Sequence, residues 1–301
     1  MISFKQIGYA LAVERTLHFK KAADDCAVSP SALSTALAEL EKQIGFSIFE
    51  RDNKKVLVTP LGKQFLEKAR DINLQMNDLY HLSETQHTPL SLPMSMGVIP
   101  TIAPYLLPRV MPALRHQYPK LKLHIVEEQS HVLLDKVKNG ELDVAILALP
   151  FAHDGLLAFE FWQEDFYWVA HADDVSAKKK EVACKELQDQ VIMLLKDGHC
   201  LKEHALAACK MKPGDISDTF SSTSLNTLVQ MVVSKLGTTL VPSMALGQLV
   251  TGNIALRAIH LNEPGPHRTI AFIIRPNYTG ANNIQLLMRL FRACLAGESN
   301  L

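Results

Sequence analysis

Apolar positions in the first 45 residues recur at three- and four-residue spacing, which is the pattern of short amphipathic helices. The pattern predicts helices over residues 3–17, 18–25 and 30–44. Ser29 can cap the third helix and Gly45 can end it. Two short helices joined by a tight turn predict a helix-turn-helix, in which the second helix enters the major groove of DNA.

A cationic hairpin follows these helices. Residues 49–60 alternate in the manner of two short strands joined by a charged turn, which predicts a wing. The third helix carries few outward cations, so its polar residues are the candidates for base contacts, whereas the wing supplies candidates for phosphate contacts. The alternative for the wing is a solvated hairpin tip. The predicted DNA-binding residues are Ser31, Ser34 and Thr35 on the helix and Arg51, Lys54 and Lys55 on the wing.

A long amphipathic helix is predicted from Thr59-Pro60 to about residue 87. Its apolar stripe advances in steps of four, three, four and three residues, as in an a/d seam. The stripe consists of Phe65, Ala69, Ile72, Met76 and Leu79. It can pack on the chain's own domain or on a second subunit. We favour the second subunit, because helix-turn-helix proteins usually read two half-sites as dimers.

From about residue 90 the pattern changes to alternating strands and helices, which predicts an α/β fold with largely parallel sheets. Strands are expected over residues 90–97, 120–127, 143–149, 165–171, 191–195, 238–241 and 269–275. Helices are expected over residues 101–117, 130–139, 200–210, 224–236 and 281–297.

Composition narrows the class of protein. A length of 301 residues suggests two or three domains, and 48% hydrophobic with 21% charged residues is ordinary for a globular protein. The sequence shows neither a signal peptide nor an apolar run of roughly 18 residues, so we expect a cytoplasmic protein that makes no membrane contact. A net charge of zero argues against a protein surface that is basic throughout, but it allows a local DNA-binding surface.

The DNA-binding pattern resembles that of the LysR family of bacterial transcription regulators. The residues that carry this resemblance are Ala22, Ala23, Val28, Ser29, Ala32, Leu33, Ser34, Leu37, Leu40, Glu41, Gly45, Phe49, Arg51, Thr59, Pro60 and Gly62. The sequence departs from the family at Ser29-Pro30-Ser31, where Ser-Gln-Pro is usual.

The resemblance extends over the whole chain and implies three parts. These are a winged helix-turn-helix over residues 1–59, a dimerising linker helix over 60–88 and a two-lobed regulatory domain over 89–301 that is similar to periplasmic binding proteins. Lobe I would comprise residues 89–163 and 268–301, and lobe II residues 164–267, with chain crossings near 163 and 267. The implied partners are promoter DNA, further copies of the chain in a dimer or tetramer, and RNA polymerase. No cofactor is implied.

Residues 196–202 followed by Cys209 resemble the redox segment of the hydrogen-peroxide-sensing members of this family. The resemblance implies that Cys200 is the thiol attacked by peroxide and that Cys209 is its resolving partner. It also implies a peroxide pocket, in which Ser130 stands where threonine is familiar. The pocket residues would be Thr101, Ser130, His199 and Arg268.

The residues themselves support redox chemistry at Cys200. If Asp197 or Gly198 caps a helix from about residue 199 to 210, Cys200 lies in its first turn, where the helix dipole favours a thiolate. A thiolate attacks peroxide and gives a sulfenic acid, which a second thiol converts to a disulfide.

The nine-residue spacing between Cys200 and Cys209 suggests a switch. Along a helix it corresponds to a rotation of about 900° and a rise of about 13.5 Å, whereas a disulfide needs Cα atoms within about 7 Å. Pairing would therefore require the helix to unwind. For the remaining cysteines, Cys26, Cys184 and Cys294, we expect inert packing.

Two further readings concern the same region. Cys200, His204, His199 and Cys209 suggest a zinc site, but Cys209 would point away from the others on a helix, so no metal site is expected. Thr101 and the run Ser222–Ser224 can cap helices or can present hydroxyls to a ligand in the interlobe cleft. We favour the ligand role for Thr101 and capping for Ser222–Ser224.

Three functions remain to be compared. The first is a peroxide-sensing regulator and the second is a LysR-type regulator that responds to a small organic inducer in the interlobe cleft. The third, a thiol peroxidase, has no need of a helix-turn-helix, a wing or a dimerising helix. No GxSxG, HExxH or P-loop pattern occurs either, so we expect no enzyme. A peroxide needs a very small polar pocket, whereas an organic inducer needs a larger one.

Overall fold

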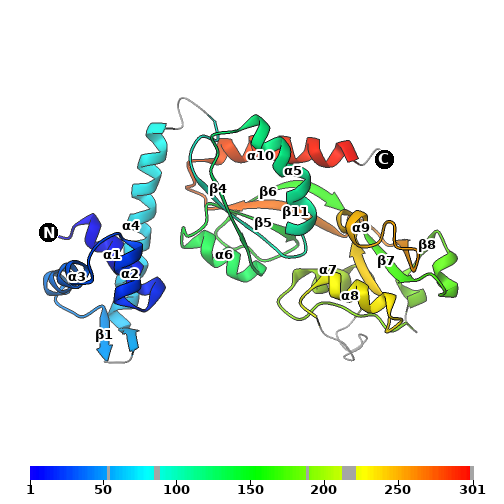
Figure 1. Ribbon diagram of the computed structural model, residues 1–301, viewed down its shortest axis with the longest axis horizontal. Coiled ribbons are helices and arrows are strands. Elements are labelled where there is room, and N and C mark those ends of the chain that lie inside the picture. Colours follow the sequence, from blue (N-terminus) through cyan, green and yellow to red (C-terminus); the bar gives the residue numbers. More distant parts are fainter. Residues whose placement is uncertain (53–54, 85–88, 188–189, 212–221, 299–301) are drawn as a thin grey trace. The chain divides into compact units, whose positions relative to one another are not determined.

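The computed structural model describes residues 1–52, 55–84, 89–187, 190–211 and 222–298. The chain divides into two compact units, residues 1–84 and 85–301, and each is described by itself (Figure 1). The described helices include none that is long and apolar enough to cross a membrane.

The N-terminal unit is a winged helix-turn-helix, as the sequence predicted. Its elements are α1 (Phe4–Thr16), α2 (Phe19–Asp25), α3 (Pro30–Ile44), β1 (Phe49–Asp52), β2 (Lys55–Val58) and α4 (Pro60–Glu84). The Ser29 hydroxyl caps α3 by accepting the Ala32 N–H, and Gly45 ends α3 with a φ of 81°. Leu33, Leu37 and Leu40 of α3 are fully buried in the core of this unit. The predicted caps and buried face of α3 are therefore confirmed.

The apolar stripe of α4 divides into two parts. Ala69 is covered by the unit itself, with 2% of the residue exposed, whereas Phe65 packs edge-on against Phe46 but stays half-buried. Ile72 and Leu79, by contrast, are 45% and 59% exposed. Ala69 is therefore not free to contact a second subunit. That expectation stays a prediction for Phe65, Ile72, Met76 and Leu79.

Lobe I of the C-terminal unit is a five-stranded sheet of order β4-β3-β5-β11-β6. Its strands are β3 (Met94–Val98), β4 (Leu123–Glu127), β5 (Val144–Leu149), β6 (Leu157–Glu164) and β11 (Arg268–Ile274). Helices α5 (Ala103–Gln117) and α10 (Ala281–Glu298) lie over one face and α6 (Ser130–Lys138) over the other (Figure 1). Strands β3, β4 and β5 are parallel, whereas β11 runs antiparallel to both of its neighbours.

Lobe II is a four-stranded sheet of order β8-β10-β7-β9. Its strands are β7 (Phe166–His171), β8 (Glu181–Val182), β9 (Thr239–Pro242) and β10 (Leu256–Leu261). Its helices are α7 (Cys200–Cys209), α8 (Leu225–Val233) and α9 (Ser243–Leu249), with the 3₁₀ turns η1 (Val175–Lys178) and η2 (Cys184–Leu187). Strand β7 pairs antiparallel with β9 and with β10, and only β8 is parallel to its neighbour.

The expectation of largely parallel sheets is therefore wrong for lobe II. The chain enters this lobe at β7 and leaves it at β10, and these two strands pair antiparallel. The sequence also gave no sign of β6, β10 or α9, and the strand expected over residues 191–195 consists only of isolated bridges at Ile192 and Leu195. The helices expected over residues 101–117, 130–139, 200–210, 224–236 and 281–297 are all present within a few residues.

The chain passes between the lobes twice. It leaves lobe I where β6 ends at Glu164 and returns where β11 begins at Arg268, and these two residues lie opposite each other in the sheet. The two crossings therefore converge on a single point.

A close backbone contact in the N-terminal unit leaves no room for a side chain at Gly62. A Cβ atom there would meet the carbonyl oxygen of Ile48 and lie 2.9 Å from its carbonyl carbon. We expect Gly62→Ala to lower the free energy of unfolding by about 1–3 kcal/mol, the usual cost of overpacking. The measurement compares two signals during unfolding. Part of the helical circular dichroism, from the N-terminal unit, should be lost before the fluorescence of Trp162 and Trp168 changes, because both tryptophans lie in the C-terminal unit.

Gly8→Ala is the matched control. Gly8 lies inside α1 and a Cβ atom there meets nothing within 4 Å. Alanine should therefore stabilise this unit by about 0.5–1 kcal/mol through its better helix propensity. Equal effects of the two substitutions would contradict the packing argument.

Candidate functional site

Cys200 begins α7 in lobe II. Residue His199 is the N-cap, with extended backbone, and the structure describes no side-chain hydrogen bond that caps this helix. Asp197 instead pairs with Lys202 at 2.7 Å. The expectation that Asp197 or Gly198 caps this helix is therefore wrong. Gly198 has a φ of 91° and a Cβ atom there would come within 2.8 Å of Gln129 Oε1, so the chain needs glycine for its approach to lobe I.

The Cys200 thiol is buried, with 3% of the residue exposed. Burial raises the pKa of this thiol above its ordinary value, and this is the largest effect. The charge of Arg268, the Ser130 hydroxyl and the Ala148 backbone act in the opposite direction, and Glu203 adds to the rise. The helix start favours a thiolate, as the sequence indicated, but desolvation outweighs it and the neighbouring cation, so the net shift of the Cys200 pKa is upward. Cys200 rests as a protonated thiol.

A buried ion pair lies where the two lobes join. Arg268 Nε and Glu164 Oε1 are 2.7 Å apart, and both side chains are fully buried. Arg268 also donates to the Thr101 hydroxyl at 3.4 Å and to the Thr101 carbonyl at 3.3 Å. Thr101 does not cap α5, whose N-cap is Ile102, so the capping alternative that the sequence left open for this residue is excluded. Its hydroxyl faces Arg268 instead.

The other oxygen of Glu164 binds lobe II. Glu164 Oε2 accepts the Met244 N–H at 2.8 Å and the Ser243 hydroxyl at 3.1 Å, both at the start of α9. Arg268 thus contacts the start of α5, and Glu164 contacts the start of α9. The sequence gave no sign that Glu164 belongs to the site, because its partner is 104 residues away.

Two buried ring nitrogens near Cys200, His199 Nε2 and His204 Nδ1, lack partners among the described residues. The Ser130 hydroxyl is also buried and lies within hydrogen-bonding reach of the Cys200 sulfur. The other ring nitrogen of His204 lies 2.9 Å from the Pro150 carbonyl, which assigns the proton to Nε2 and leaves Nδ1 as an acceptor. Burial lowers the pKa of both histidines, so they are neutral near pH 7. Buried polar groups normally have partners, so these atoms indicate a place for a small polar molecule.

A cavity of about 680 Å³ opens between the lobes. Thr101 and His199 line it, whereas Cys200 and Ser130 are not among its described lining residues. Burial raises the pKa of Tyr105, which also lines it, to about 12, so its hydroxyl is a neutral donor. The hydroxyl of Ser224, another lining residue, caps α8 by accepting the Thr227 N–H, which confirms the predicted capping in this run. The remaining lining residues are Pro100, Pro104, Glu127, Gln129, Thr223, Leu225, Asn226, Gln248 and Leu249.

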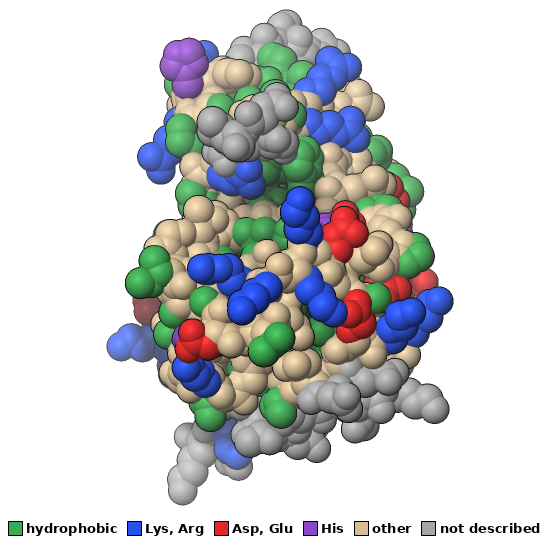
Figure 2. Space-filling view, turned by 90° about the vertical axis from the view of Figure 1, so that its right-hand side faces the viewer, with side chains coloured by type: hydrophobic (Ala, Val, Ile, Leu, Met, Phe, Trp, Pro, Cys, Tyr) green, Lys and Arg blue, Asp and Glu red, His purple; other side chains and the backbone are tan. Residues whose placement is uncertain are grey.

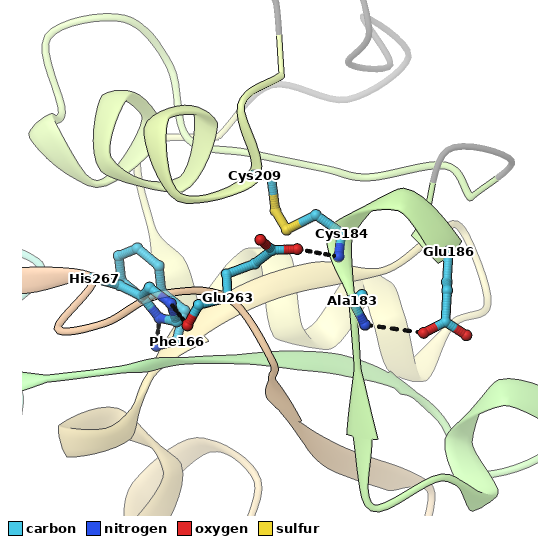
Figure 3. The surroundings of a disulfide bond; sticks show 7 residues. All are labelled: Phe166, Ala183, Cys184, Glu186, Cys209, Glu263 and His267. Carbon is cyan, nitrogen blue, oxygen red and sulfur yellow. Dashed lines mark hydrogen bonds between the residues drawn. A yellow bond between two sulfur atoms is a disulfide. The ribbon is translucent and has the colours of Figure 1, made fainter.

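The cysteines are paired differently from the expectation. Cys209 forms a disulfide with Cys184, and Cys200 is a free thiol (Figure 3). The interpretation of Cys184 as inert packing is wrong, because it is covalently bonded. The structure also does not hold Cys209 as a thiol available to Cys200. The two residues form the opposite ends of α7, as the nine-residue spacing predicted.

The predicted DNA-binding residues lie on α3 and the wing. Ser31 and Thr35 are exposed and Ser34 is half-buried. The Ser31 hydroxyl lies 3.1 Å from that of Ser29, so it is held near the start of α3. Lys55 is exposed, whereas Lys54 and the side chain of Arg51 lie outside the described residues.

A winged helix-turn-helix together with a two-lobed α/β unit that encloses a cavity defines a transcription regulator with a sensing domain. Residues 4–63 match the family model "Bacterial regulatory helix-turn-helix protein, lysR family". Residues 89–296 match the model "LysR substrate binding domain". The chain therefore belongs to the LysR family.

Curated relatives match nine-tenths of the chain or more. The regulator EstR of Acinetobacter baylyi is 35% identical over 98% of this chain and 97% of its own length. The dual regulator OxyR of Escherichia coli is 32% identical over 99% of this chain and 97% of its own length. A "Hydrogen peroxide-inducible genes activator" of Dickeya chrysanthemi is 34% identical over 91% of this chain and 90% of its own length.

Solved structures of OxyR proteins share the fold. A full-length OxyR variant from Pseudomonas aeruginosa matches with a TM-score of 0.82 and 30% identity, over 98% of this chain and 96% of that chain. An OxyR variant from Corynebacterium glutamicum with hydrogen peroxide bound matches with a TM-score of 0.68 and 29% identity, over 99% of this chain and 94% of that chain. This chain thus resembles the OxyR proteins within its family.

The buried ion pair provides a test of the junction between the lobes. Glu164→Gln leaves Arg268 buried without a counter-charge, so we expect the free energy of unfolding to fall by about 3–5 kcal/mol. Denaturant unfolding followed by tryptophan fluorescence measures it. Glu160→Gln on the exposed side of the same strand is the control and should change stability by less than about 0.5 kcal/mol. Similar values for the two variants would contradict the role of the pair.

Proposed function

We propose that this chain is a hydrogen-peroxide-responsive regulator of transcription in which Cys200 is the trigger. The observation that carries the proposal is a buried free thiol at the start of α7, close enough to the Arg268 charge and the Ser130 hydroxyl for both to favour its thiolate. Relatives named as hydrogen-peroxide-inducible activators support it. A peroxide-bound structure of a similar chain supports it further.

The proposed reaction at Cys200 needs only the thiol and hydrogen peroxide, without a cofactor. The sulfur attacks one peroxide oxygen, the O–O bond breaks, and the thiol proton leaves with the other oxygen as water. Cys200 becomes a sulfenic acid. The unpartnered His199 Nε2 and His204 Nδ1 are available to accept that proton, and the Ser130 hydroxyl is placed to relay it. Arg268 stabilises the negative charge that develops on sulfur.

Because burial raises the pKa of the Cys200 thiol, we propose that its oxidation depends on entry of the peroxide into the site. A buried thiol with a raised pKa reacts slowly with general oxidants, because only the thiolate is nucleophilic. A small polar molecule that reaches the unpartnered atoms can restore the hydrogen bonds that burial removed. We propose that this is how peroxide is selected over larger oxidants, with Thr101, Ser130, His199 and Arg268 forming its pocket.

We further propose that Cys209 resolves the sulfenic acid when Cys209 is not bonded to Cys184. A Cys200–Cys209 disulfide forms with release of a second water molecule. Because these residues form the two ends of a ten-residue helix, α7 must unwind for their sulfurs to meet. Unwinding of α7 is the conformational signal in this proposal, and the oxidised chain would act on promoter DNA through α3 and the wing.

A second candidate function has its own observation. The interlobe cavity of about 680 Å³ falls within the range of roughly 300–1,000 Å³ usual for small-molecule sites and is far larger than a peroxide needs. A LysR-type regulator that binds a small organic inducer there would leave Cys200 without a role. The relative EstR, which is not named for peroxide, is compatible with this candidate.

Thiol mapping separates the two candidates. After brief exposure of the reduced protein to low-micromolar hydrogen peroxide, we expect Cys200 to be oxidised before Cys26 and Cys294, and a Cys200–Cys209 disulfide to follow. The readout is mass spectrometry of peptides after alkylation, and Cys200→Ser should abolish the disulfide. Cys26→Ser and Cys294→Ser are controls and should leave it intact. Oxidation of Cys200 no faster than of Cys26 would contradict the proposal and favour the organic inducer.

The exposed part of α4 predicts a dimer. Ile72 and Leu79 are exposed apolar residues on the same stripe, and a second copy of the chain would cover them. We expect Ile72→Glu combined with Leu79→Glu to convert the dimer to monomer at micromolar concentration, measured by sedimentation equilibrium. Lys68→Glu alters charge at an exposed position of the same helix and should leave the dimer intact. An unchanged mass for the double variant would place the interface elsewhere.

A further inference from the structure

The Cys184–Cys209 disulfide lies at the end of α7 opposite to Cys200. It joins the last residue of α7 to the first residue of η2, 25 positions earlier in the chain, with Cα atoms 5.1 Å apart (Figure 3). This separation satisfies the geometry of a disulfide with α7 fully helical. Cys184 is therefore the partner that Cys209 reaches without any change of fold.

The disulfide borders a cavity of about 720 Å³. Cys209 is half-buried and Cys184 is 5% exposed, so Cys209 is the more exposed of the two bonded cysteines. Access to the sulfur is one of the factors that decide the rate of thiol–disulfide exchange. The lining residues are Ala183, Cys184, Lys185, Cys209, Lys210, Met211, Asn262 and Glu263.

The charges around this cavity favour an anion. Lys185 and Lys210 are exposed and each follows one of the two cysteines in the chain. Of the two carboxylates beside the disulfide, Glu263 accepts the Cys184 N–H at 2.8 Å and Glu186 accepts the Ala183 N–H (Figure 3). Glu186 also pairs with Lys179. Lysines continue at Lys178–Lys180. The face seen in Figure 2 carries many Lys and Arg side chains, with Asp and Glu side chains among them. A thiol that carries carboxylates would be attracted here.

We propose that Cys184 and Cys209 form a second redox site, which exchanges with a small anionic thiol of the glutathione class through this cavity. The thiolate attacks the Cys209 sulfur, the Cys184–Cys209 bond breaks, and Cys184 leaves as a thiolate that takes up a proton. A second molecule of the same thiol then attacks the sulfur of the bound small thiol, the bond to Cys209 breaks, and Cys209 leaves as a thiolate that takes up a proton. The products are two protein thiols and one disulfide of the small thiol, so two electrons pass to the protein.

The site has a consequence for Cys200, and this part rests on the proposed peroxide function. Cys209 can bond only one sulfur at a time. While it is bonded to Cys184 it cannot resolve a Cys200 sulfenic acid, and the bond fixes the end of α7 that must unwind. Reduction of the Cys184–Cys209 pair therefore makes the sensor able to form its Cys200–Cys209 disulfide.

The first experiment does not involve Cys200. The full-length Cys200→Ser protein is equilibrated in mixtures of reduced and oxidised glutathione, quenched with acid, alkylated and mapped by mass spectrometry. We expect Cys184 and Cys209 to lose and regain alkylation together as the mixture changes, while Cys26 and Cys294 stay alkylated in the same mixtures. A Cys184 that is alkylated in the most oxidising mixture, or a pair that never opens in the most reducing one, would overturn the site.

The charge argument is tested by exchange rates. In the same background, Lys185→Glu combined with Lys210→Glu should slow reduction by glutathione by roughly five-fold or more and accelerate reduction by cysteamine, which is cationic. Lys235→Glu is the control, because Lys235 is exposed and paired with Asp173 away from this cavity. Equal effects on the two thiols would overturn the assignment of an anionic thiol.

The link to Cys200 is tested separately in the wild-type chain. Two samples are compared. One has the Cys184–Cys209 bond formed and has been freed of glutathione, and the other has the pair reduced. Each receives one equivalent of hydrogen peroxide and dimedone. We expect the bonded protein to give a trapped Cys200 sulfenic acid and the reduced protein to give mostly the Cys200–Cys209 disulfide. Equal yields of that disulfide would overturn the link. Failure of Cys200 to react in either sample would refute the peroxide function and leave the glutathione result standing.

Discussion

The buried ion pair between Glu164 and Arg268 joins the two lobes of the C-terminal unit. Both strands that pass between the lobes reach this pair, because Glu164 ends β6 and Arg268 begins β11. Arg268 contacts Thr101 at the start of α5 and Glu164 binds the start of α9. Two charges taken out of water need such complete pairing, because either one alone would be strongly destabilising. The same Arg268 acts on the Cys200 thiol, so the junction between the lobes and the proposed redox centre share one charge.

Helix α7 separates two sulfur environments. At its start Cys200 is buried and protonated, beside polar atoms that lack partners. At its end Cys209 is half-buried, bonded to Cys184 and bordered by lysines and solvent. A helix that must unwind before its ends can bond is suited to convert sulfur chemistry into a change of shape. In this account peroxide acts at one end and cellular thiols act at the other, and Cys209 is the residue on which both converge.

Local patterns predicted the N-terminal unit well and the C-terminal unit less completely. The helices of the helix-turn-helix depend on caps such as Ser29 and on a leucine face, both of which are visible in the sequence. The antiparallel centre of lobe II and the strands β6 and β10 depend on pairing between segments far apart in the chain, for which periodicity holds no signal. The partner of Glu164 is likewise remote.

The cysteines show the same limit. Spacing correctly predicted that Cys200 and Cys209 lie at opposite ends of a helix, but connectivity cannot be read from spacing, so the bond to Cys184 was missed. The net direction of the Cys200 pKa shift could not be predicted either, because it depends on burial in the folded chain, which outweighs the effect of a helix start.

The most direct test of the account is DNA binding by the full-length protein on its own promoter before and after one equivalent of hydrogen peroxide. Footprinting of the wild-type chain should show a changed pattern of protection after peroxide, reversed by a thiol reductant, and Cys200→Ser should show the reduced pattern under both conditions. A Cys200→Ser protein that changes its footprint as the wild type does, or a wild type that does not respond, would contradict the claim that Cys200 is the trigger.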